Sequence, residues 1–205
     1  RAGNVVTNAT KWIPVKPGTD GALMMGMIRW IIENKWYNKF FLENTTETSA
    51  NKDGEKAWTG GTYLVIAGPE DYPDDLMYLR GKHLAGTDPA DGEKYVVWNG
   101  SGTEIFDKVD HGTLFFDGEI QDKDGATIQV KTALQMLKDK AFEKTMDEWA
   151  QICGIDVNDL KWLAQEFTNY GKSAGMLVYR VFGVQPNGVY TVMAMISLHM
   201  LIGNI

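Results

Sequence analysis

The chain is poor in the residues that build cross-links and metal centres. Its 205 residues include one cysteine, Cys153, and three widely separated histidines. A single cysteine excludes an internal disulfide and an iron–sulfur cluster held by this chain alone. The helical, apolar surroundings of Cys153 indicate a buried structural thiol. His83 lies in a charged stretch and is expected to be solvated. With one cysteine and three scattered histidines, we assign no catalytic residue and no metal ligand from the sequence.

Basic runs and long apolar runs are also missing. The formal net charge is −7 and no stretch is rich in lysine or arginine, which argues against a nucleic-acid or anionic-membrane partner. No run of about 18 apolar residues occurs, so we expect no direct membrane insertion. The chain begins at Arg1 and ends in the apolar residues 201–205. We therefore expect one domain, residues 1–205, that is an internal piece of a longer protein.

The most informative stretch runs from residue 12 to residue 32. Residues 12–15 are apolar and β-prone, Pro17 and Gly18 predict a tight turn, and a helix is expected over about 21–34. Because this helix is apolar nearly all round, it should be buried. The simplest interpretation of Asp20, at its start, is a helix cap. The alternative is a carboxylate that accepts two parallel N–H bonds from a ligand, such as those at N1 and N2 of guanine.

The rest of the chain changes from strand patterns to helical ones. Short β-prone runs fill the middle, with a hairpin around residues 99–102 and a turn predicted at residues 117–118. Helical periodicity begins at residue 132, a capping box is predicted at Thr145 and Glu148, and a buried strand is expected at residues 176–179. A last helix follows. This alternation predicts an α/β fold, a parallel sheet flanked by helices, with a β-rich and hairpin-rich insertion at residues 44–130.

Three segments resemble one enzyme family. Residues 14–23, with the sequence PVKPGTDGAL, are similar to the segment P-x-(R/K)-P-G-T-D-x-A-L of the molybdopterin oxidoreductases, the dimethyl sulfoxide reductase family. Residues 132–167 and 183–205 are similar to two later segments of that family, the second of which reads Q-x-x-N-G and ends in L-x-G-N-I. Because order and spacing agree, the resemblance covers nearly the whole chain.

This resemblance implies a bis(molybdopterin guanine dinucleotide) molybdenum cofactor. The positions that match the family's cofactor-binding segments are Lys16, Gly18, Thr19, Asp20, Gln185 and Asn187. The first four would contact the guanosine end of one pterin dinucleotide, and the last two belong to a loop that approaches the pterin. Pro186 departs from the pattern, since many members have histidine there. The iron–sulfur (4Fe–4S) cysteines, the molybdenum ligand and the second guanosine site would lie outside this chain.

Within the family, residues 12–30 and the insertion that begins near Asn44 are similar to tetrathionate reductase catalytic subunits. That similarity implies anaerobic respiratory reduction of a small sulfur oxyanion such as tetrathionate. It also implies two partners, an iron–sulfur electron-transfer subunit and a membrane anchor subunit. The implied location is the periplasm or the outer face of the cytoplasmic membrane. The isolated chain is expected to be inactive.

Two other functions fit parts of the pattern. A domain of this fold could serve as a non-catalytic module that binds a nucleotide or docks a partner subunit. A cysteine cluster and a molybdenum ligand in the full-length sequence would argue for the enzyme instead. An independent dinucleotide enzyme has less support, because G-x-G-x-x-G is missing after the first predicted strand.

Overall fold

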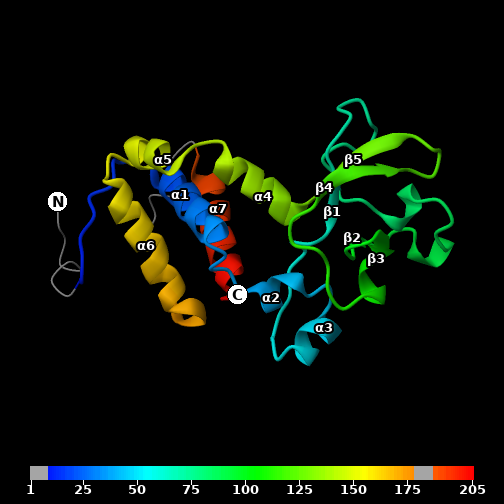
Figure 1. Cartoon of the computed structure of the whole chain (residues 1–205), viewed down its shortest axis with the longest axis horizontal. Coiled ribbons are helices and arrows are strands. Elements are labelled where there is room, and N and C mark those ends of the chain that lie inside the picture. Colours follow the sequence, from blue (N-terminus) through cyan, green and yellow to red (C-terminus); the bar gives the residue numbers. More distant parts are fainter. Residues whose placement is uncertain (1–8, 178–186) are drawn as a thin grey trace. The chain divides into compact units, whose positions relative to one another are not determined.

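The structure is a computed structural model that describes residues 9–177 and 187–205 (Figure 1). Contacts between residues divide the chain into two compact units. The first comprises Arg1–Tyr37 and Lys140–Asn204, and the second comprises Asn38–Asp139 together with Ile205. The predicted insertion, residues 44–130, lies entirely within the second unit, and the single-domain organisation stays a prediction. No helix among the described residues combines the length and the apolar character needed to cross a membrane.

The first unit is built around α1 (Asp20–Glu33), the buried helix that the sequence predicts. Three helices pack against it (Figure 1): α5 (Met146–Cys153), α6 (Val157–Asn169) and α7 (Gly188–Ile202). Gly26 allows close approach, because a β-carbon at that position would lie 2.7 Å from Leu160 Cδ2 of α6. Contact with three helices explains why α1 is apolar nearly all round.

The capping box predicted at the start of α5 is confirmed. The Glu148 backbone N–H donates to the Thr145 hydroxyl oxygen at 3.2 Å, and the Thr145 backbone N–H donates to the Glu148 carboxylate at 2.7 Å. Arg29 of α1 donates to the carbonyl of Lys144 at 3.1 Å, just before this cap. These bonds fix where α5 begins relative to α1.

The second unit contains two antiparallel sheets. One has the strand order β1-β5-β4 and the other is the hairpin β2-β3, in the predicted place. The strands are β1 (Leu64–Ile66), β2 (Val96–Trp98), β3 (Thr103–Ile105), β4 (Asp117–Gln121) and β5 (Thr127–Thr132). In the register, Val65 lies opposite Lys131, and Gly118 lies opposite Val130. The helices of this region are α2 (Lys39–Glu43), α3 (Glu47–Lys52) and α4 (Ala133–Phe142).

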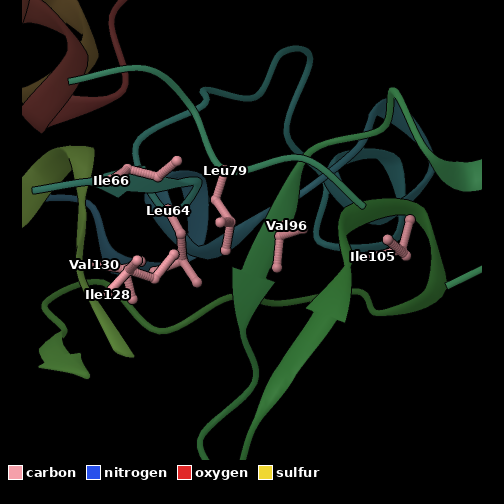
Figure 2. Packing of buried hydrophobic residues seen from close by; sticks show 7 residues of the cluster. All are labelled: Leu64, Ile66, Leu79, Val96, Ile105, Ile128 and Val130. Carbon is pink, nitrogen blue, oxygen red and sulfur yellow. The ribbon is translucent and has the colours of Figure 1, made fainter. Parts of the chain in front are cut away.

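Side chains from four of these strands and one loop form the core of the second unit (Figure 2). Its members are Leu64, Ile66, Leu79, Val96, Ile105, Ile128 and Val130. Each is at most 4% exposed, so the short strands are held by shared burial as well as by their hydrogen bonds.

The predicted parallel sheet is not found among the described residues, where every paired strand is antiparallel. Residues 12–15 belong to no strand. The strand expected at residues 176–179 is not formed at Met176 and Leu177, and residues 178 and 179 lie outside the described residues. A β-prone run becomes a strand only where another strand offers its backbone groups.

Two local predictions in the second unit are wrong. Asp117–Gly118 is not a turn but the start of β4, because Asp117 pairs with Lys131 and accepts a hydrogen bond from the Gln129 amide at 2.7 Å. His83 is buried rather than solvated. Its Nδ1 accepts the Arg80 backbone N–H at 3.0 Å, and its Nε2 lies 2.9 Å from the Asp74 carboxylate. Both predictions used only the residues next to each position in the sequence. The groups that interact with His83 and Asp117 come from other segments of the fold.

The buried Asp91 gives the second unit a stability that depends on pH. Its carboxylate, in a side chain that is 11% exposed, lies 2.6 Å from Lys108 Nζ and 2.9 Å from Lys94 Nζ. These two hydrogen bonds hold the pKa of Asp91 below its ordinary value, and the bond from Lys108 has the larger effect. The carboxylate therefore stabilises the fold fully above the unfolded pKa of about 3.9, and the stabilisation is lost as the pH falls through the lower folded pKa.

We expect the urea concentration at the unfolding midpoint to decrease when the pH is lowered below about 4. The Asp91→Asn variant should be less stable than the parent at pH 7 and should lose less additional stability between pH 5 and pH 2. Unfolding followed by circular dichroism at several pH values tests this. An acid loss of the same size in both proteins would show that Asp91 does not control it.

Candidate functional site

The turn that leads into α1 has the predicted form. The Thr19 backbone N–H donates to the Lys16 carbonyl at 3.2 Å, which closes a four-residue turn with Pro17 and Gly18 at its centre. Gly18 has φ of +83°, a conformation that glycine adopts at little cost. The Thr19 hydroxyl donates to the same carbonyl at 2.6 Å. This turn places Asp20 as the first residue of α1.

Asp20 is not the cap of the helix. Thr19 occupies the N-cap position, and no side chain makes a capping hydrogen bond there. The Thr19 hydroxyl is bonded to Lys16 instead. Within the described part of the chain, the Asp20 carboxylate has neither a hydrogen bond nor an ion pair. The helix-cap interpretation of Asp20 is therefore wrong, and the alternative, a carboxylate directed at a ligand, stays a prediction.

Asp20 lines a hollow of about 580 Å³ within the first unit. A volume of that size is typical of small-molecule sites. The lining is mainly apolar and comes from α1, from the C-terminal half of α6 and from the segment that follows it. Its members are Asp20, Leu23, Met24, Met27, Leu163, Glu166, Phe167, Tyr170, Ser173, Ala174, Gly175, Met176 and Leu177.

Sequence reasoning gave no role to the α6 side of this hollow. Glu166, Phe167 and Tyr170 line it there. The sequence carries a signal for Glu166, which lies three residues after Leu163 and four before Tyr170, so that a carboxylate shares a helix face with apolar residues. Two carboxylates and two aromatic rings therefore line one hollow that is otherwise mostly apolar.

Only part of the predicted site set is brought together. Lys16, Gly18 and Thr19 form the turn just before Asp20 but do not line the hollow. Asn187 is the exposed residue before α7 and makes no side-chain cap. The first turn of α7 nevertheless lies against the first turn of α1, since a β-carbon at Gly21 would lie 3.0 Å from Thr191 Oγ1.

The two predicted segments thus approach each other through the starts of α1 and α7. Gln185, the remaining predicted residue, lies outside the described residues.

Cys153 lies beside this turn as a structural thiol. It is fully buried, its sulfur lies 3.7 Å from the Thr19 carbonyl oxygen, and its own carbonyl accepts the Lys16 backbone N–H at 2.9 Å. Burial raises the pKa of the Cys153 thiol, and the negative charge of Asp20 adds to the increase. The thiol therefore stays protonated at neutral pH and cannot serve as a nucleophile.

We expect Cys153 to react with iodoacetamide far more slowly in the folded chain than in urea. In both states the rate should increase with pH, because the thiolate is the form that reacts. Alkylation rates measured by mass spectrometry from pH 6 to pH 10 test both points. Equal rates in folded and unfolded protein would contradict the buried position.

The Asp20 and Glu166 carboxylates of the hollow suit a ligand that donates N–H hydrogen bonds. The Asp20 carboxylate can accept two parallel N–H bonds, and Phe167 and Tyr170 contribute aromatic side chains to the lining. Phosphate groups would be repelled by Asp20 and Glu166. They fit better outside the hollow, near the ammonium group of Lys16.

Three similar proteins are polypeptides of reductases from three organisms. The chain is 36% identical over 206 residues to a selenate reductase polypeptide of Mesobacillus selenatarsenatis, covering 100% of this chain and 19% of the relative. It is 36% identical over 204 residues to a tetrathionate reductase polypeptide of Archaeoglobus fulgidus, covering 99% of this chain and 17% of the relative. It is 35% identical over 199 residues to the corresponding tetrathionate reductase polypeptide of Salmonella typhimurium, with coverage of 95% and 19%.

The chain spans about a fifth of the length of these relatives. No family model matches it. Among solved structures, acetylene hydratase from Pelobacter acetylenicus is similar with a TM-score of 0.50 at 15% identity, covering 100% of this chain and 16% of that one. At that identity the likeness concerns the fold alone.

Proposed function

Because the chain belongs to the molybdopterin oxidoreductase family, we propose that it is a segment of the catalytic subunit of a molybdenum oxidoreductase. In that subunit, Asp20 and the hollow it lines would bind the guanosine end of a molybdopterin guanine dinucleotide. The observation that carries this proposal is the position of Asp20. Its carboxylate has no partner among the described residues, does not cap α1, and lines a mainly apolar hollow.

The residues present fit such a nucleotide. The hollow, of about 580 Å³, has room for a purine nucleoside. The Asp20 carboxylate suits the N1–H and N2–H donors of guanine, which adenine does not offer in the same pattern. Specificity for guanine would follow, because adenine would leave the carboxylate without its paired donors.

Other residues of this chain would orient the remainder of the cofactor. Lys16 would attract its phosphates, and Gly18 would keep the turn free of a side chain. Asn187 and Gln185 would approach the pterin side, by resemblance to the family. When bound, the cofactor would supply the two-electron redox chemistry, whereas these residues would bind and position it.

The substrate we propose is an oxyanion. Two of the three relatives described above belong to tetrathionate reductases, which favours a sulfur oxyanion such as tetrathionate and anaerobic respiration. Selenate is the second candidate, because the selenate reductase polypeptide is equally similar, at 36% identity. Activity of the full-length protein with a reduced viologen dye, measured on tetrathionate and on selenate separately, distinguishes them. The isolated chain should reduce neither.

The rest of the assembly is inferred from the family. We propose that iron–sulfur ligands and the molybdenum ligand lie outside this chain. The partners we propose are an iron–sulfur electron-transfer subunit plus a membrane anchor subunit, in the periplasm or on the outer face of the cytoplasmic membrane. The β-prone residues 12–15 would join a parallel sheet with strands supplied by the longer polypeptide.

The cofactor content of the full-length protein tests the proposal. We expect about one molybdenum or tungsten atom per chain, and guanosine monophosphate released by mild hydrolysis of the bound cofactor. Protein that is well folded, comes from a cofactor-competent host and contains neither would favour a nucleotide-binding or subunit-docking module instead.

A further inference from the structure

Helix α7 has an apolar face with no partner among the described residues. Four of its side chains are largely exposed: Val189 at 72%, Tyr190 at 74%, Met193 at 58% and Ile196 at 53%. Residues 189, 193 and 196 follow the spacing i, i+4, i+7 and therefore lie along one side of the helix. Tyr190 extends the same strip by one residue.

The opposite side of α7 is already buried. Thr191, Ala194 and Leu198 are at most 7% exposed, and the helix packs on α1. No Asp, Glu, Lys or Arg occurs between Gly188 and Ile202. The helix is therefore apolar on its buried and on its exposed side, with no charged rim between them. That pattern belongs to a helix surrounded by protein on all sides.

Other helices of the same unit look different. The exposed residues of α6 are polar and include Asn158, Gln165 and Asn169. Those of α5 include the charged Asp147 and Glu148. Ile152 of α5, at 37% exposed, is the one large apolar exception, so a continuous exposed apolar strip occurs on α7 and not on α5 or α6. A strip of this kind on a stable protein marks a surface that another element covers.

We propose that the α7 strip, residues Val189, Tyr190, Met193 and Ile196, is covered in the full-length protein by a segment of the same polypeptide outside residues 1–205. The inference rests on the proposed function only in treating the chain as part of a longer catalytic subunit. The chain spans 19% and 17% of two relatives, so more than four fifths of a polypeptide of that length lies elsewhere. Because α7 carries no charged residue on any side, we assign the cover to the same polypeptide, which surrounds helices of this composition, rather than to a separable partner protein.

Photocrosslinking in the full-length protein tests the occupant. The photoreactive amino acid p-benzoylphenylalanine replaces Met193 in one variant and Gln151, an exposed polar residue of α5, in the control variant. After irradiation, crosslinked peptides are identified by mass spectrometry. We expect position 193 to crosslink in high yield to one peptide of the same polypeptide outside residues 1–205, and position 151 to give a several-fold lower yield.

Four results would overturn the proposal. They are a yield at position 193 no higher than at position 151, crosslinks only to peptides within residues 1–205, crosslinks to a second copy of the chain, and crosslinks to a different protein. Cofactor content, measured on the same preparations, separates this inference from the proposed function. A protein without the guanine dinucleotide that still gives the expected crosslink would refute the cofactor role and support the covered strip.

Discussion

Replacement of Asp20 by alanine in the full-length protein is expected to weaken binding of the guanine dinucleotide roughly ten- to hundredfold. Loss of a hydrogen-bond partner that carries a charge costs about 1.5–3 kcal/mol, and each 1.4 kcal/mol corresponds to about tenfold in affinity. The fold should remain intact, because Asp20 bonds to no other described side chain and does not cap α1. Cofactor content per chain and the thermal unfolding midpoint, measured on the same sample, check both statements.

Asp147→Ala is the matched control for this experiment. Asp147 is also an acidic residue in the first turn of a helix, α5, but it is exposed and lines no part of the hollow. The control should keep its full cofactor content. Asp20→Asn should behave like Asp20→Ala, since an amide presents one acceptor and a donor where two acceptors are needed. Cofactor content unchanged in both Asp20 variants would remove Asp20 from the site.

Substitution of Gly81 by alanine should destabilise the second unit by about 1–3 kcal/mol. Gly81 lies in a short 3₁₀ turn, where its N–H donates to the Lys94 carbonyl at 2.9 Å. A β-carbon at this position would lie 2.4 Å from the backbone oxygen of Asp91. Because the obstacle is backbone, it cannot rotate away as a side chain would, and the two segments must separate.

Gly102→Ala supplies the comparison for Gly81→Ala. Gly102 lies in the turn of the β2-β3 hairpin, and a β-carbon there would meet no atom within 4 Å. We expect its effect to stay within about 0.5 kcal/mol, as for most surface substitutions. Urea unfolding of the two variants gives the comparison directly. Equal midpoints would mean that residues 81 and 91 do not approach as described.

The parts of this fold that local chemistry determines could be predicted from the sequence. The turn at residues 16–19 follows from Pro17 and Gly18, and the start of α5 follows from the reciprocal bonds of Thr145 and Glu148. The buried character of α1 follows from its uniform apolarity. In each case the deciding interaction lies within a few residues of the pattern that predicts it.

The parts that depend on distant partners could not be predicted in this way. The sequence shows that residues 12–15 are β-prone, but it does not show which strand would pair with them. His83 appeared solvated because its neighbours are charged, whereas its Nε2 lies beside Asp74. Asp117 appeared to start a turn because Asp-Gly favours one, yet pairing with Lys131 keeps it in β4.

The candidate site also has one part that the sequence indicates and one part that it does not. Asp20 is a candidate that its motif and its place at the start of a predicted helix indicate. The hollow is not indicated in this way, because it is formed only when the α6 face that carries Phe167 and Tyr170 packs beside α1. A carboxylate such as Glu166 on an apolar helix face is the sequence signal that points toward such a hollow.

The most direct test of the central claim is an experimental structure of the full-length protein with its cofactor bound. The measurement is the distance from the two carboxylate oxygens of Asp20 to N1 and N2 of the guanine. We predict that both distances lie at about 2.7–3.2 Å, the range of N–H···O hydrogen bonds, with the base in the hollow between α1 and α6. A guanine bound elsewhere, with the Asp20 carboxylate facing solvent or protein, would contradict the account.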